Sequence, residues 1–150
     1  MRKLMITVLA ASLGLAGSAA PAGAGLFSAT GEVIAILAND LFVGEAEGHL
    51  NGAGTLDIHS QKTPELTCRG EFTSSAALGG SGQMLCSDGA TAAFHFQRLS
   101  VLRGYGVGTF SRGTMSFAYG LSADEAGPYL KLPRGKKLAH NGTELKLVDL

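Results

Sequence analysis

The sequence predicts an all-β protein: an antiparallel meander or partly closed barrel of about eight to ten short strands, with one short helix near residues 122–131. Short runs of Val, Ile, Phe, Thr and Leu alternate with turn residues, which is typical of strands joined by tight turns. After residue 24 there are 19 glycines, about twice the usual ~7% share, and the chain has no tryptophan. Gly-x-Gly pairs recur at a regular spacing, which indicates repeated β-hairpins.

The first 24 residues have the pattern of a cleaved export signal. Arg2 and Lys3 precede the apolar residues 4–15, and Ala22-Gly-Ala24 matches an A-x-A cleavage site. The apolar run is shorter than the ~20 residues that a membrane-spanning helix needs, and no lipobox cysteine accompanies it. We therefore expect residues 25–150 to form one β-rich domain that is periplasmic or secreted and has no transmembrane segment.

The charge of the expected mature chain is close to neutral. Without Arg2 and Lys3, the 12 basic residues fall to 10 against 12 acidic residues, a net charge near −2. Acidic side chains gather between residues 25 and 60, and basic ones in the last third. We expect the two groups to neutralise each other rather than form a basic face. Nucleic acid is not an expected partner.

The first two strands are expected at residues 31–38 and 41–50, joined by a turn at Asn39-Asp40. Within the second strand, two sets of side chains alternate. The predicted core face carries Phe42, Gly44, Ala46, Gly48 and Leu50, and the other face carries Val43, Glu45 and Glu47.

Three hairpins follow, each opened by a Gly-x-Gly pair. The pairs begin at residues 52, 80 and 106, which are spacings of 28 and 26 residues. Such periods usually mean stacked supersecondary units. The expected strands are 52–58 with 66–72, 80–86 with 92–96, and 106–110 with 114–119.

The central hairpin allows its register to be predicted. If Cys68 lies opposite Cys86, then Gly70 lies opposite Met84 and Phe72 opposite Gly82, so that large side chains cover glycines. In an oxidising compartment the two cysteines of the chain are expected to form a Cys68–Cys86 disulfide, with a reduced buried pair as the alternative.

The next turn, Ser87-Asp-Gly89, allows two registers. A two-residue type I′ turn would place Phe94 on the face away from Met84. A three-residue loop with a left-handed Gly89 instead places Gly82 opposite Phe94. We favour the second register because it keeps four large apolar side chains on one face. These are Phe72, Met84, Phe94 and Phe96.

The last segment combines a helix and a hairpin. Ser122 and Glu125 match a capping box, which predicts the start of the helix over 122–131. Asn141-Gly142 predicts a hairpin turn between strands at about 137–140 and 143–148. Leu145 and Leu147 of that hairpin are expected to point inward.

The middle of the chain, about residues 48–120, resembles the MORN repeat. In this family, the β-hairpin unit has an aromatic-x-Gly-x-Phe/Trp pattern, followed by a Gly-x-Gly pair and an Asp-Gly turn. Gly70-Glu-Phe72, Gly80-Ser-Gly82 and Asp88-Gly89 follow in that order here. The period is longer than the family's, and Cys68 stands where an aromatic residue is usual. The resemblance implies a meandering antiparallel sheet that contacts proteins or lipid surfaces.

Residue patterns that would carry catalysis or metal binding are weak. His49, His59, His95 and His140 do not have metal-site spacing, so no metal or cofactor is expected. His95, between two phenylalanines, is expected on the sheet surface. There is no Gly-x-Ser-x-Gly elbow. Glu45 and Glu47 share a strand face and would be the carboxylate pair of a hydrolase, but a solvated face is the better interpretation.

A cluster of four cations in the C-terminal segment is the strongest candidate contact for an anionic partner. It consists of Lys131, Arg134, Lys136 and Lys137, within seven residues that also include Pro133 and Gly135. We expect a non-catalytic exported protein that binds or scaffolds a protein or an anionic envelope surface. The alternative is an exported inhibitor of a hydrolytic enzyme, with a protruding loop at 74–78 or 131–137.

Overall fold

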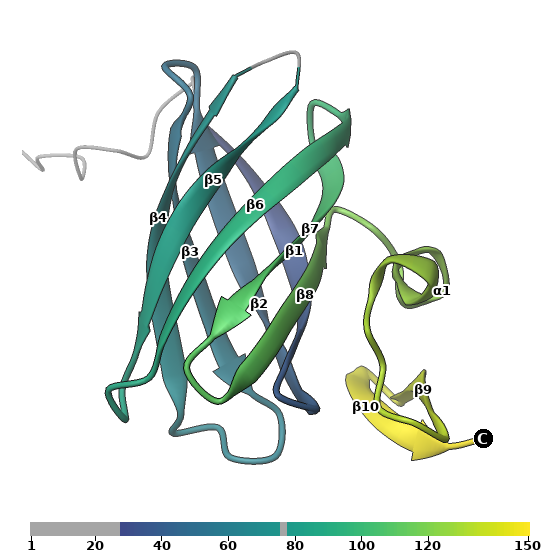
Figure 1. Ribbon diagram of the computed structural model, residues 1–150. Coiled ribbons are helices and arrows are strands. Elements are labelled where there is room, and N and C mark those ends of the chain that lie inside the picture. The colour runs from purple at the N-terminus through teal and green to yellow at the C-terminus, as the bar shows by residue number, and fades with distance from the viewer. Residues whose placement is uncertain (1–27, 76–77) are drawn as a thin grey trace, which may run out of the picture.

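The computed structural model describes residues 28–75 and 78–150, so the expected export signal lies outside the described residues. Eight antiparallel strands form a closed barrel, each strand pairing with the next and β8 pairing with β1 (Figure 1). The all-β fold class is therefore confirmed. The barrel strands are β1 (Ser28–Leu37), β2 (Asp40–His49), β3 (Ala53–Ser60), β4 (Thr67–Ser75), β5 (Gly79–Cys86), β6 (Thr91–Ser100), β7 (Arg103–Phe110) and β8 (Gly113–Tyr119).

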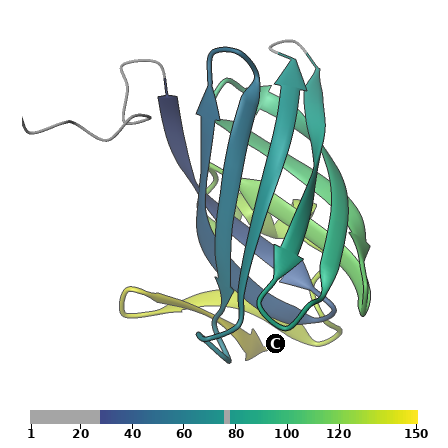
Figure 2. The ribbon, with the colours of Figure 1, turned by 90° about the vertical axis from the view of Figure 1, so that its left-hand side faces the viewer.

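The end of the chain lies outside the barrel. It forms the short helix α1 (Ala123–Ala126), the 3-10 turn η1 (Gly127–Tyr129) and a separate hairpin of β9 (Lys136–Asn141) and β10 (Glu144–Asp149). This hairpin lies beside the lower part of the barrel in Figure 1 and behind that part in Figure 2. No helix of residues 28–75 and 78–150 is long and apolar enough to cross a membrane.

The barrel has two different ends. One end carries the β1–β2, β3–β4, β5–β6 and β7–β8 turns, at the bottom of Figure 1. Residues 33–37 of β1 pair with β8, whereas residues 28–32, at the other end of the barrel, pair only with β2. We call this second end, at the top of Figure 1, the open end.

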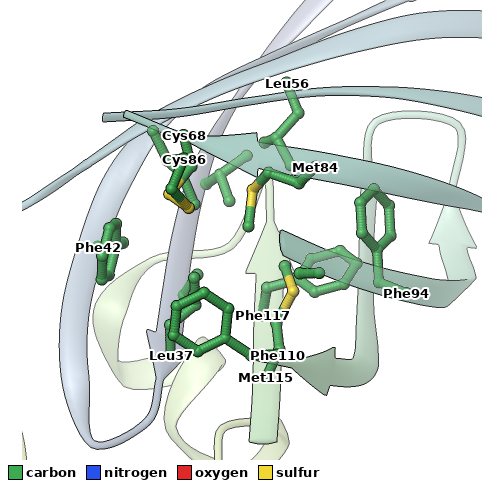
Figure 3. Close-up of a cluster of buried hydrophobic side chains, with 14 of the residues drawn as sticks. Leu37, Phe42, Leu56, Cys68, Met84, Cys86, Phe94, Phe110, Met115 and Phe117 are labelled. Atoms are coloured by element: carbon green, nitrogen blue, oxygen red, sulfur yellow. A yellow bond between two sulfur atoms is a disulfide. The ribbon is translucent and has the colours of Figure 1, made fainter. Parts of the chain in front are cut away.

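The interior follows the alternation of strand side chains. In β6, Ala92, Phe94 and Phe96 are buried, and His95 between the two rings is exposed, as the sequence predicted. The lower interior is a continuous apolar core (Figure 3). Its labelled members are Leu37, Phe42, Leu56, Cys68, Met84, Cys86, Phe94, Phe110, Met115 and Phe117.

The predicted register of the central hairpins is confirmed. Cys68 pairs with Cys86 across β4 and β5 and forms the disulfide, with the two Cα atoms 3.9 Å apart. Across β5 and β6, Gly82 lies opposite Phe94, and Gly89 has a φ of 88°, as the three-residue loop requires. The disulfide is consistent with an extracellular or periplasmic location.

Two details of the first hairpin were predicted wrongly. The turn consists of Ala38 and Asn39, with φ of 47° and 71°, and Asp40 already belongs to β2 opposite Leu37. The Asp40 carboxylate accepts a hydrogen bond from Ser60 Oγ at 2.7 Å, which holds it at the start of the strand. Leu50 does not reach the core but is 80% exposed, because β2 ends at His49.

The C-terminal segment covers the outside of the barrel wall formed by β1, β2 and β8. Leu145 is buried there together with apolar side chains of α1 and η1, and Leu147 is partly buried. The two leucines thus point toward the protein, as predicted, but toward the outer surface of the barrel. Outward-facing residues of the wall that they help to bury include Ile34, Ile36, Leu41 and Ala118.

The short helix predicted near residues 122–131 is present. The α-helical part ends at Ala126, and Gly127 and Pro128 continue only as the 3-10 turn. The predicted capping box is confirmed: Ser122 Oγ accepts from the Glu125 N–H, and the Glu125 carboxylate accepts from the Ser122 N–H at 2.9 Å.

The ionised carboxylate of Glu125 contributes to stability, and this contribution is lost in acid. Its hydrogen bonds to the Ser122 backbone and side chain, and then to Arg103, lower the pKa of the carboxyl below its usual 4.5. A lowered folded-state pKa stabilises the fold above pH 4.5, and this contribution disappears as the pH falls through the folded value. We expect Glu125→Gln, which retains an acceptor, to reduce the urea midpoint at pH 7 but not at pH 2. Equal reductions at both pH values would contradict this.

Candidate functional site

The open end of the barrel contains a cavity of about 270 Å³. It lies above the packed core, and its wall is mostly apolar. The lining comes from β1, β2, β4, β6, β8 and the loops that follow β2 and β6: Ser28, Ala29, Thr30, Gly31, Ala46, Gly48, His49, Leu50, Phe72, Phe94, Phe96, Arg98, Val101, Leu102, Phe117 and Tyr119.

Aromatic rings line one part of this cavity, and each lies against a glycine of a neighbouring strand. A Cβ added at Gly54 would be 2.1 Å from the Phe72 ring, and one added at Gly106 would be 2.4 Å from the Phe117 ring. The rings also contact each other edge-on, with Phe72 and Phe96 centroids 5.5 Å apart. The recurring glycines therefore provide the space into which the rings fold. The remaining pairs of this kind are Phe94 with Gly82, Phe96 with Gly80 and Tyr119 with Gly104.

The cavity exists because one strand breaks this pattern. Strands β4, β6 and β8 carry large aromatic rings inward at the open end, but β2, the fourth even-numbered strand, carries Ala46 and Gly48. A Cβ added at Gly48 would meet no atom within 4 Å. In a barrel of eight strands, side chains normally fill the interior. Two small residues on β2 leave that filling incomplete.

A positive charge lies at the edge of the cavity. Arg98 continues the inward-facing alternation of Phe94 and Phe96, and its guanidinium donates to Ser74 Oγ and to the Val101 carbonyl, both at 2.7 Å. Within residues 28–75 and 78–150, no carboxylate forms an ion pair with it. Its Nε is buried and has no hydrogen-bond partner among these residues.

Tyr119 is the second polar group of the cavity. Its hydroxyl is also buried, without a hydrogen-bond partner in the described part of the chain. Burial raises the pKa of the Tyr119 hydroxyl, and the charge of Arg98 acts in the opposite direction. Arg98 of β6 and Tyr119 of β8 both pair with Gly104 of β7, which places them at the same level of the barrel. Buried polar groups normally have partners, so two unpaired donors at one cavity need an explanation.

The residues singled out from the sequence lie elsewhere. The disulfide is in the core below the cavity. Lys131, Arg134 and Lys137 are exposed on the C-terminal segment, and Lys136 donates to Asp149 at 2.6 Å. None of these four cations lines the cavity.

The two glutamates of β2 lie on the outer face. Glu45 pairs across the sheet with Glu32 and Asp57, and Asp57 forms an ion pair with Arg69 at 3.0 Å. Of the four histidines, only His49 lines the cavity. The described residues contain no group of three or more His, Cys, Asp or Glu side chains that could hold a metal ion.

Sequence reasoning missed Arg98 and Tyr119, although the alternation contains the signal. Arg98 follows Phe94 and Phe96 at a spacing of two, and Tyr119 follows Phe117 in the same way. A polar residue in the core phase at the end of a strand faces the interior near the barrel mouth. That Arg98 Nε and the Tyr119 hydroxyl have no hydrogen-bond partner among the described residues, however, could be recognised only from the closed barrel.

Models of known protein families, characterised proteins and solved structures give no match to this chain. The resemblance to MORN repeats therefore stays a prediction. The arguments that follow depend on the geometry of the cavity.

Proposed function

We propose that this protein is a non-catalytic binding protein that holds a small apolar molecule in the open end of its barrel. The observation that carries the proposal is the cavity of about 270 Å³, lined by Phe72, Phe94, Phe96 and Phe117. Concave, mostly apolar sites with a few polar groups are the usual form of small-molecule sites.

The lower half of the barrel supports this function by holding the site rigid. The disulfide links β4 and β5 beneath the cavity, and the C-terminal segment covers the wall formed by β1, β2 and β8. Burial on both faces fixes the lower part of β2, around Leu41 and Phe42, below the small residues that create the space. A site on rigid strands needs little ordering when a ligand enters, which favours affinity.

The macromolecular partners expected from the sequence stay predictions. The basic segment is exposed at Lys131, Arg134 and Lys137, so it remains open to an anionic envelope surface or an acidic protein. The inhibitor alternative depends on a protruding loop, and Leu78, at the end of the 74–78 candidate, is 81% exposed. None of the described residues of these two surfaces lines the cavity of the open end.

The proposal is tested with a neutral fluorescent probe. N-phenylnaphthylamine is titrated into the purified, disulfide-bonded protein, and its emission is expected to rise and saturate at one equivalent. Gly48→Phe places a ring in the free space next to Gly48 and is expected to weaken binding at least about 10-fold, the effect of ~1.4 kcal/mol.

A matched variant controls for the added ring itself. Val107 is 48% exposed and does not line the cavity, so Val107→Phe adds a similar ring to the outside of β7. We expect this variant to bind the probe as the unmodified protein does. Thermal unfolding would verify that both variants fold. Absence of saturable binding, or unchanged binding by folded Gly48→Phe, would refute the proposal.

A further inference from the structure

The two polar groups of the cavity have a chemistry that the apolar lining does not explain. Arg98 uses two of its three nitrogens to bind Ser74 Oγ and the Val101 carbonyl, and its Nε–H has no partner in the described residues. The Tyr119 hydroxyl is unpaired in the same way. An unpaired buried donor is unfavourable, so a bound molecule that satisfied both donors would bind more tightly.

The charge of Arg98 is also not compensated by any carboxylate of the described residues. The ion pairs of other arginines show what Arg98 lacks: Arg103 pairs with Glu125, and Arg112 pairs with Asp88. Arg98 has only neutral acceptors among the described residues. A partly buried cation is stabilised by an anion, and guanidinium groups match the planar, two-oxygen geometry of a carboxylate.

We propose that the cavity takes a single-chain amphipathic carboxylate, with its head group at Arg98 and Tyr119 and its apolar chain along the phenylalanine rings. This inference rests on the proposed function. One positive charge and two free donors match a monoanion with two acceptor oxygens. A phosphate dianion would need further cations, whereas Arg98 is the one Lys or Arg among the described residues that line the cavity, beside a single histidine, His49. The phenylalanine rings that line the cavity provide an apolar surface for the chain.

Binding requires a change of side-chain conformation. In the structure, Arg98 Nε and the Tyr119 hydroxyl oxygen are covered by protein atoms. The guanidinium is held by two neutral acceptors, one hydroxyl and one carbonyl, each through a single hydrogen bond. A carboxylate, which is itself charged and can accept two parallel bonds, binds a guanidinium more strongly. The head group would therefore replace them when Arg98 rotates toward the cavity.

The test compares ligands that differ only in the head group. Decanoate, decan-1-ol and decylammonium are used to displace bound N-phenylnaphthylamine from the protein. We expect decanoate to bind about 10- to 100-fold more tightly than decanol. This is the gain in affinity expected from one charged hydrogen bond between the carboxylate and the protein. Decylammonium is expected to bind more weakly than decanol.

Three variants locate the effect. Arg98→Met removes the charge but keeps an apolar stem, and it is expected to bring the decanoate-to-decanol affinity ratio close to one. Tyr119→Phe, which removes a single oxygen, is expected to lower this ratio about 3- to 10-fold. Arg103→Met removes an equal charge from the outer surface and is expected to leave the ratio unchanged.

The failure of this inference differs from the failure of the proposed function. Equal affinities for decanoate and decanol, a stronger affinity for decylammonium, or an unchanged ratio in Arg98→Met would each overturn the carboxylate assignment. Saturable probe binding would leave the binding function intact in all three cases. If neither the probe nor any decyl compound binds, both proposals fail together.

Discussion

Removing the disulfide is expected to lower the free energy of unfolding by about 3 kcal/mol. The two cysteines are 18 residues apart, and a loop of about that length contributes ~3 kcal/mol by restricting the unfolded chain. Cys68 and Cys86 are also among the most buried residues, at 0% and 4% exposure. In the variant Cys68→Ala with Cys86→Ala, the loss of two sulfur atoms from the core adds to the entropic effect.

Urea and thermal unfolding would measure this loss. We expect the midpoint temperature of the double variant to fall by about 10 °C, given the few degrees per kcal/mol typical of a domain of this size. Reductant provides the control: it should lower the midpoint of the unmodified protein toward that of the variant and leave the variant unchanged. Equal stabilities of the oxidised protein and the variant would show that the disulfide does not stabilise the fold.

The register of the central strands could be predicted because several local signals agreed. Three signals required the same pairing of β4 with β5 and of β5 with β6. They are the positions of Cys68 and Cys86, the glycine in the Ser87–Gly89 turn and the alternation of apolar side chains around Phe94. A slip of one residue would have moved apolar side chains to the outer face. Where only turn chemistry was available, at Ala38-Asn39, the prediction missed by one residue.

The closure of the barrel and its cavity could not be predicted in the same way. Pairing of β1 with β8 joins residues about 80 positions apart in the chain, such as Ile34 and Ala118, and no local turn specifies it. The cavity depends on that closure, because Gly48 faces empty space only when β2 stands across the barrel from β6. What the sequence does contain is the continuous apolar run in β1, typical of a strand buried on both faces.

The glycines that accept aromatic rings are expected to be intolerant of even one methyl group. A Cβ at Gly106 would lie 2.4 Å from the His95 carbonyl oxygen and 2.4 Å from the Phe117 ring. Relief would require both the β6 backbone and the ring to move, and Phe117 is held edge-on against Phe94 at 5.3 Å. Overpacking of this kind costs about 1–3 kcal/mol, and we expect Gly106→Ala to reach the upper end.

Gly48 provides the matched comparison, since it is also a barrel glycine with an inward-facing Cα–H. Its added Cβ would meet no atom within 4 Å, and its φ is not in the left-handed range. Gly48→Ala is therefore expected to stabilise the protein by about 0.5 kcal/mol, because alanine restricts the unfolded chain. Urea unfolding of the two variants should thus give stability changes of opposite sign. If both substitutions destabilised the protein equally, the glycines would be needed for the flexibility of the strands and not for the packing of the aromatic rings. The explanation of the cavity as a missing ring on β2 would then fail.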